Sequence, residues 1–231
     1  GSTSINIAAD GFPEGFFNAA TNPGARLLSI GGICEDAIGG VMAGISTYGC
    51  HIGAGSSYGA FIAALQHITA RLHGIGQQMK HEYNGEPFHP WLLVCAHAGL
   101  KTGEDGPTHA DPQALQLLQE NFPQGIMITL TPWDPQEMWP MLITALKKRP
   151  AVIAPFVTRP NEKIFDRAAL GLPPATAAVT GVYAMRRGDR RKKPYHGTLV
   201  LQGSGITNTF VEEVLPRIID AGLNMNIFYV C

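Results

Sequence analysis

The stretch that decides the fold is GIMITLTPWDPQEMWPMLITALKKRPAVIAPFV, residues 125–157. Short apolar runs lie at its two ends, at 125–130 and 151–157, and such runs are typical of strands buried on both faces. The segment between them is long enough for a helix that crosses back over the sheet. A strand, a helix and a strand in this order predict a right-handed crossover and a parallel sheet.

The helix of this unit carries signals at both ends. Asp134 suits the N-cap, Pro135 the first helical position and Glu137 the third, which is the pattern of a capping box. The cations at 147–149 suit the C-terminal end of the helix dipole. We therefore expect the helix to begin at Pro135 and to end near Arg149.

The alternation of predicted strands and helices extends toward the N-terminus. Residues 91–96 are a further buried run and residues 27–30 a shorter one. Apolar residues fall at helical spacing over 37–45 and 61–72, and a Gly- and Ser-rich turn at 53–57 is predicted between those two helices. The predicted fold class is α/β, a doubly wound and mainly parallel sheet with helices on both faces.

The pattern weakens after residue 160. Residues 161–180 contain Gly171 and two adjacent prolines, and are predicted to connect two domains. Two strands, a helix and a final strand are predicted over 181–231. We expect one domain over 3–160 and, in 181–231, the truncated start of a second α/β domain, because so short a unit cannot bury both faces of its own sheet.

Composition narrows the class of protein. Of 231 residues, 45% are hydrophobic and 15% charged, which suits a globular chain with a large core. A formal net charge of -1 gives no overall field for nucleic acid or an anionic membrane, and the basic run at 186–193 is predicted to be a solvated hairpin. No apolar run approaches the roughly 20 residues of a membrane helix. The 4 cysteines show no disulfide framework, so a reducing cytoplasm is expected.

Residue types that carry chemistry are densest after the buried run at 91–96. His97 follows that run, and the loop Gly103-Glu104-Asp105-Gly106-Pro107-Thr108-His109 lies a little further on. In an open parallel sheet the carboxyl ends of the strands line the ligand crevice. The residues by themselves leave two interpretations open, a ligand-binding loop and a structural turn.

The loop at 103–109 closely resembles a signature of the transketolase family, at the corresponding place after a buried strand that ends in His. Gly32-Ile33-Cys34-Glu35 is similar to the family's Gly-Ile-Arg-Glu, and Ser57-Tyr58-Gly59-Ala60-Phe61 resembles its Thr-Phe-x-x-Phe segment. From Thr198, Leu-Val-Leu-Gln-Gly-Ser-Gly resembles the start of its C-terminal domain. The resemblance implies a thiamine diphosphate-binding fold of the pyrimidine-domain type.

Cofactor binding and activation follow from the resemblance. It implies that Glu35 is the catalytic acid that shares a proton with N1′ of the aminopyrimidine, which favours the imino tautomer that deprotonates the thiazolium. Tyr58 and Phe61 occupy positions where the family places aromatic rings against that pyrimidine, and Asp10 resembles a residue near the cofactor. From the residues alone, Glu35 could equally be an ordinary carboxylate at a helix N-terminus, and the two rings core residues.

The resemblance also implies a sugar phosphate site. His97 would lie in the region that contacts the sugar phosphate, Asp105 would accept a hydrogen bond from the donor's C2 hydroxyl, and His109 would contact sugar hydroxyls. Arg159 matches the phosphate-binding arginine of the family, and a guanidinium can bind phosphate through two parallel hydrogen bonds.

The chain also departs from the family. Cys34 replaces an arginine, Ala64 stands where a third aromatic residue is expected, and the stretch at 73–90 is longer than the usual connection. The Gly-Asp-Gly…Asn motif that holds the diphosphate and its Mg²⁺ or Ca²⁺ has no match in these 231 residues. We therefore expect a diphosphate-binding domain or subunit as a partner, and a homodimer.

The expected function is the pyrimidine-binding part of a transketolase of the pentose phosphate pathway, inactive without a diphosphate-binding domain. It would transfer a two-carbon ketol unit between sugar phosphates. Two alternatives stay open: the E1 component of a 2-oxo acid dehydrogenase, and a non-catalytic interaction domain of the same fold. No metal site, nucleic acid or membrane partner is expected in this chain.

Overall fold

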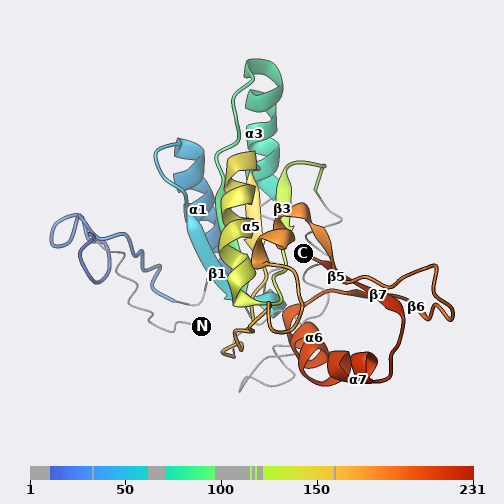
Figure 1. Cartoon of the computed structure of the whole chain (residues 1–231). Helices are drawn as coiled ribbons and strands as arrows, with labels where there is room; N and C mark the ends of the chain where they lie inside the picture. The colour runs from blue at the N-terminus through green and yellow to red at the C-terminus, as the bar shows by residue number, and fades with distance from the viewer. Residues whose placement is uncertain are drawn as a thin grey trace.

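A computed structural model describes residues 11–32, 34–61, 71–96, 122–158 and 160–231, together with Leu115 and Leu118. Figure 1 shows the chain, with α3 rising above the body. The elements of the first part, in chain order, are α1 (Glu35–Tyr48), β1 (Ala54–Tyr58), the 3-10 turn η1 (Gly59–Phe61), α3 (Arg71–Asn84), β2 (Trp91–Ala96), β3 (Met127–Leu130), α5 (Pro135–Lys148) and β4 (Val152–Pro155).

A parallel sheet organises this first part. Its strand order within the described residues is β1-β2-β4-β3, and the three neighbouring pairs are parallel. The strands are in register at Ser57 with Cys95 and at Met127 with Val152. All carboxyl ends therefore meet at one edge of the sheet and all amino ends at the opposite edge, as the α/β fold class predicts.

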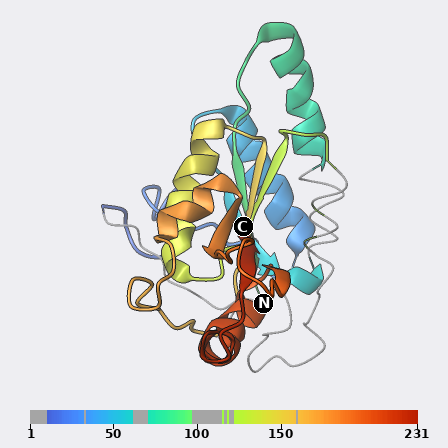
Figure 2. The ribbon, with the colours of Figure 1, turned by 45° about the vertical axis from the view of Figure 1, so that its right-hand side comes forward.

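The two faces of the sheet contribute to two separate cores. Ile153 packs into a core with Met141 and Ala145 of α5, whereas its neighbour Val152 packs into another core against Met42 of α1. Side chains alternate between the faces along a strand, so adjacent residues reach opposite layers. Figure 2 accordingly shows α5 on one side of the strands and α1 and α3 on the other. The prediction of helices on both faces is confirmed.

Two local predictions in this first part were wrong. The Gly- and Ser-rich stretch at 53–57 is a turn only at its start, and from Ala54 it forms β1, because pairing with β2 supplies the ladder that its residues do not favour on their own. Residues 27–30 form no strand; Leu27 makes an isolated bridge with Phe16. The long connection at 73–90 contains most of α3.

The start of α5 follows the predicted pattern with one change. Asp134 is the N-cap, and its carboxylate accepts from the Gln136 backbone N–H at 3.0 Å. Glu137 does not return to the N-cap residue as in a capping box; it accepts from the Trp133 backbone N–H at 3.2 Å. The other carboxylate oxygen of Glu137 is used by Arg167 and Tyr183, and this tertiary contact explains the change.

A second, smaller sheet follows. Its elements are η5 (Ala175–Thr180), β5 (Val182–Arg186), β6 (Gly197–Leu201), α6 (Ser204–Thr209), the π-helical turn η6 (Phe210–Val214), α7 (Leu215–Asp220) and β7 (Met225–Val230). The strand order is β5-β7-β6, with β5 antiparallel and β6 parallel to β7. These are the strands and the helix that the sequence predicts there, but the predicted hairpin at 186–193 was wrong, because β5 and β6 each pair with β7 and not with each other.

The second sheet and the segment before it join one of the two cores. Phe165, Val211 and Tyr229 belong to the same buried cluster as Met141 and Ala145 of α5. The segment at 161–180 therefore packs against the first part over a shared apolar core. The boundaries of the two predicted domains stay predictions.

No helix in the described part of the chain combines the length and the apolar character that a membrane crossing requires.

Candidate functional site

The carboxyl edge of the parallel sheet brings Glu35 next to β1. Helix α1 precedes β1 and packs against it, so the first residue of the helix lies beside the end of the strand (Figure 1). Ser57 in β1 donates its hydroxyl to Oε1 of Glu35 at 3.1 Å. Glu35 is half-buried, so its carboxylate is held in place and still open to a ligand.

The N-terminus of α1 adds to the electrostatics of this edge. Glu35 and Asp36 lie in its first turn, where the helix dipole favours negative charge. The N-cap residue Cys34 makes no side-chain cap bond, and its thiol is exposed. The first-turn amide groups of α1 are therefore not satisfied by a side chain of the N-cap residue.

Two aromatic residues follow Ser57 in the chain, at the carboxyl end of β1. Tyr58 ends β1 and Phe61 ends η1, with ring centroids 5.8 Å apart and planes at 66°. The side chain of Phe61 is 40% exposed. This edge-to-face pair with one partly open ring provides apolar surface at the carboxyl end of β1.

The other predicted site residues lie outside the described residues: Asp10, His97, Asp105, His109 and Arg159. The segment that leads to His97 and the segment that leads to Arg159 pair with each other. Cys95 and Phe156 form a parallel bridge, and the Val157 backbone N–H donates to the Cys95 carbonyl at 2.9 Å. The described backbone thus brings the ends of β2 and of the β4 segment to the edge that carries Glu35.

Ser57 is a residue of this site to which the sequence assigned no role. It was noted only as part of the segment that resembles the family's aromatic motif, and its surroundings were predicted to be a turn. A serine in a turn has no fixed partner, whereas in β1 it faces Glu35 across 22 positions of the chain. The segment Ala54-Gly55-Ser56-Ser57-Tyr58 shows no alternation of apolar and polar residues, so the sequence carried no strand signal for it.

These residues fit an aminopyrimidine. A carboxylate with one oxygen already oriented by a hydroxyl can share a proton with a ring nitrogen, and the two aromatic side chains provide an apolar surface for a flat ring. Among the residues that the structure describes, no group of three or more His, Cys, Asp or Glu side chains could hold a metal ion.

The comparisons with known proteins agree with this arrangement. Residues 2–161 match the model of the protein family described as transketolase, pyrimidine binding domain. The matched range contains the parallel sheet, α1 and every predicted site residue. No individual curated protein matches the chain.

Proposed function

Since this chain belongs to the transketolase pyrimidine-binding domain family, whose members are thiamine diphosphate-dependent enzymes, we propose that it provides the pyrimidine half of a transketolase active site. The observation that carries the proposal is the contact between Ser57 and Glu35 at the carboxyl edge of the sheet. It orients the one acid that the resemblance assigns to cofactor activation. The reaction would transfer a two-carbon ketol unit from a ketose phosphate to an aldose phosphate.

Each residue of the described site has a defined task in this proposal. When bound, the cofactor supplies an acidic thiazolium carbon that can attack a carbonyl group. Glu35 holds a proton at N1′ of the aminopyrimidine, and Ser57 keeps the carboxylate in the orientation that this proton requires. Tyr58 and Phe61 cover the pyrimidine ring and exclude water from the proton that Glu35 shares.

The loop at 103–109 supports transketolase rather than a 2-oxo acid dehydrogenase. In this proposal Asp105 and His109 bind sugar hydroxyls, and His97 and Arg159 bind the sugar phosphate. A guanidinium suits this task because its planar fork matches two phosphate oxygens. The E1 alternative is favoured by the changed surroundings of the acid, where Cys34 replaces arginine, and by the extra helical length in α3.

The diphosphate group and its Mg²⁺ or Ca²⁺ are assigned to a partner. The family match names a pyrimidine-binding domain, and the described residues hold no cluster of metal ligands. We propose that a diphosphate-binding domain or subunit completes the site and that two copies of this chain take part in the assembly. A half-exposed Glu35 beside a partly exposed Phe61 is the surface that such a partner would cover.

Replacing Glu35 tests the mechanism. Glu35→Gln keeps the shape of the side chain and its bond to Ser57 while removing the acid, so we expect ketol transfer by the complete assembly to fall at least about 100-fold. Asp36→Asn is the matched control, since it removes a carboxylate from the same helical turn without touching Ser57. Both variants are first shown to unfold at the denaturant midpoint of the wild type. Full activity of Glu35→Gln would contradict the proposal.

Substrate choice separates the two enzyme classes. The assembly is given a ketose phosphate with an aldose phosphate acceptor in one assay, and pyruvate in another. Turnover of the sugar phosphates, with an Asp105→Ala variant that loses most of it, supports transketolase. Turnover of pyruvate alone establishes the E1 alternative, and a complete assembly inactive in both assays supports the non-catalytic domain.

A further inference from the structure

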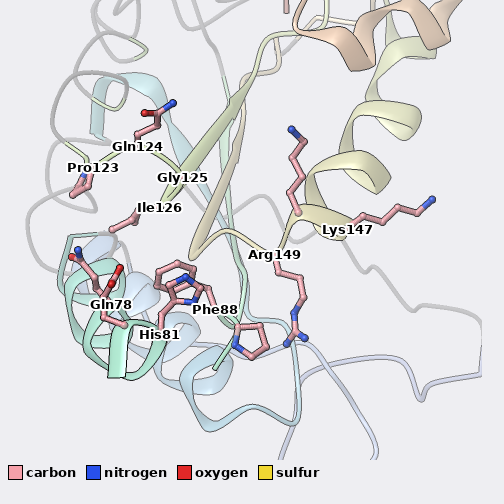
Figure 3. Close-up of a pocket in the computed structure, with 12 residues that line it drawn as sticks. Gln78, His81, Phe88, Pro123, Gln124, Gly125, Ile126, Lys147 and Arg149 are labelled. Carbon is pink, nitrogen blue, oxygen red and sulfur yellow. The ribbon is translucent and has the colours of Figure 1, made fainter. Parts of the chain in front are cut away.

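A pocket lies at the edge of the parallel sheet opposite to Glu35. It has a volume of about 380 Å³ and is enclosed by α3, by the segment before β2, by the segment before β3 and by the end of α5. Figure 3 shows its walls, with Gln78, His81 and Phe88 on one side and Gln124 above them. Pockets for small molecules generally occupy roughly 300–1,000 Å³.

The position of this pocket separates it from the cofactor edge. It adjoins the amino ends of β2, β3 and β4, whereas Glu35 lies at the carboxyl edge. Five of its lining residues come from the stretch at 73–90, namely Gln78, His81, Glu82, Pro87 and Phe88. The stretch at 73–90 therefore supplies one whole wall of the pocket.

The lining has an excess of positive charge. Lys147, Lys148 and Arg149 contribute to it, against the single carboxylate of Glu82. Within the described part of the chain no carboxylate forms an ion pair with any of these three cations. Figure 3 shows the side chain of Arg149 running downward from the end of α5, with His81 and Phe88 to its left, while Lys147 extends away on the other side. Of the two cations labelled there, Arg149 is therefore the one that stays on the side of the pocket that carries the rings.

The backbone at Arg149 gives an independent reason to assign a role to its side chain. Arg149 is the C-cap of α5 and has φ 50°, ψ 54°, the left-handed conformation that helices usually give to glycine. Its N–H closes the helix by donating to the Leu146 carbonyl at 3.1 Å, which a glycine would do equally well. Arginine here pays a conformational cost that the helix itself does not require.

The opposite wall is flat and carries polar groups. The ring of His81 stacks on that of Phe88, with centroids 4.7 Å apart and planes at 22°. His81 Nδ1 lies 2.9 Å from the Glu86 carbonyl and must donate to it, so Nε2 remains for a ligand. The side-chain amides of Gln78 and Gln124 add donors to the lining.

We propose that this pocket is a second ligand site, which binds a small organic phosphate. The guanidinium of Arg149 binds the phosphate oxygens through paired hydrogen bonds, and the lysines add a positive field. The organic part lies against the stacked rings of His81 and Phe88. This site is independent of the proposed function, since it involves none of the residues at the carboxyl edge.

The test is equilibrium binding of phenyl phosphate to the complete chain, by isothermal titration calorimetry at constant ionic strength. Phenol and inorganic phosphate serve as probes for each half of the ligand. We expect phenyl phosphate to bind at least tenfold more tightly than either. Arg149→Gly should weaken it at least tenfold, and because glycine suits the left-handed position this variant should unfold at or above the wild-type midpoint.

Arg191→Ala is the matched control, because it removes one exposed arginine from the basic run at 186–193 and should leave binding unchanged. Glu35→Gln should leave it unchanged as well, so this result does not depend on the proposed catalytic role. Equal weakening by Arg149→Gly and Arg191→Ala would indicate unspecific attraction and overturn the proposal. So would binding of phenyl phosphate no tighter than that of phenol.

Discussion

Glu137 is a fully buried carboxylate whose two oxygens have different partners. One accepts from the Trp133 backbone N–H, and the other from Arg167 at 2.9 Å and from the Tyr183 hydroxyl at 2.6 Å. Tyr183 in turn accepts from the Trp133 indole N–H at 2.6 Å. Burial raises the pKa of Glu137 above its usual range, and burial together with the nearby Glu137 raises the pKa of Tyr183. This network ties the start of α5 to β5 and to the segment between them.

Removing the Tyr183 hydroxyl tests how much this network stabilises the protein. Tyr183→Phe leaves the Trp133 indole and one Glu137 oxygen each with one bond fewer, and a buried polar group that loses its partner costs about 1–3 kcal/mol. We expect a loss of that size in the free energy of unfolding, measured by urea denaturation. Tyr195→Phe, which removes an accessible hydroxyl bonded to Thr198 and Asn226, should cost less than about 1 kcal/mol.

At the scale of elements, the approach of α1 to β1 depends on Gly53. A Cβ built at this position would lie 2.1 Å from the Met42 carbonyl oxygen in α1. The Gly53 backbone N–H also donates to the buried Ser46 hydroxyl oxygen at 2.8 Å. The close helix–strand contact places Glu35 at the level of Ser57, so a glycine far from the site determines its geometry.

Substitution of Gly53 by alanine should lower the free energy of unfolding, whereas the same substitution at Gly44 in α1 should not. Gly53→Ala forces α1 away from β1, and we expect a loss of more than about 2 kcal/mol in the free energy of unfolding. Gly44→Ala is the matched control, because its Cβ would meet nothing within 4 Å, and alanine is favoured over glycine in a helix by about 1 kcal/mol. Chemical denaturation of both variants measures the difference. Equal stability of the two would show that the helix can move at no cost.

At the scale of the whole molecule, several acidic protons are buried, both in the core that the second sheet shares with the parallel sheet and in the separate core that contains Cys95. Burial raises the pKa of the Cys231 thiol to about 12 and raises that of the Cys95 thiol as well. It also raises the pKa of the Tyr183 and Tyr229 hydroxyls. The folded state therefore keeps protons at alkaline pH that the unfolded chain releases.

Stability should decline as the solution becomes alkaline. The unfolded thiols lose their protons near pH 9 and the unfolded phenols near pH 10, whereas the folded groups lose theirs only at higher pH. Folding then binds protons, so the free energy of unfolding falls from pH 9 upward, by at most about 1.4 kcal/mol per pH unit for each group. Urea denaturation at pH 8 and pH 10.5 measures this. A Cys231→Ser variant should show a shallower decline, and an equal stability at both pH values would contradict the prediction.

Elements that depend on local signals were predicted from the sequence, whereas elements that depend on contacts between distant residues were not. The strands at 91–96, 125–130 and 151–157 and the helix from Pro135 were found because their apolar runs and caps are local signals. β1 was missed because its serines and glycines have little strand preference, and only pairing with β2 makes them a strand. Likewise the sequence of α3 is mostly polar and gives a weak local signal. Its position depends on packing near Ile126.

The sequence by itself determined the α/β class, the family, and Glu35 as the candidate acid, because periodicity and motif order are written along the chain. Only the tertiary structure decided that Ser57 meets Glu35, that Glu137 turns from its cap toward Arg167, and that Arg149 lines a pocket with His81. Each of these contacts joins residues far apart in the chain, and the close packing of helices on a twisted sheet sets which of them meet.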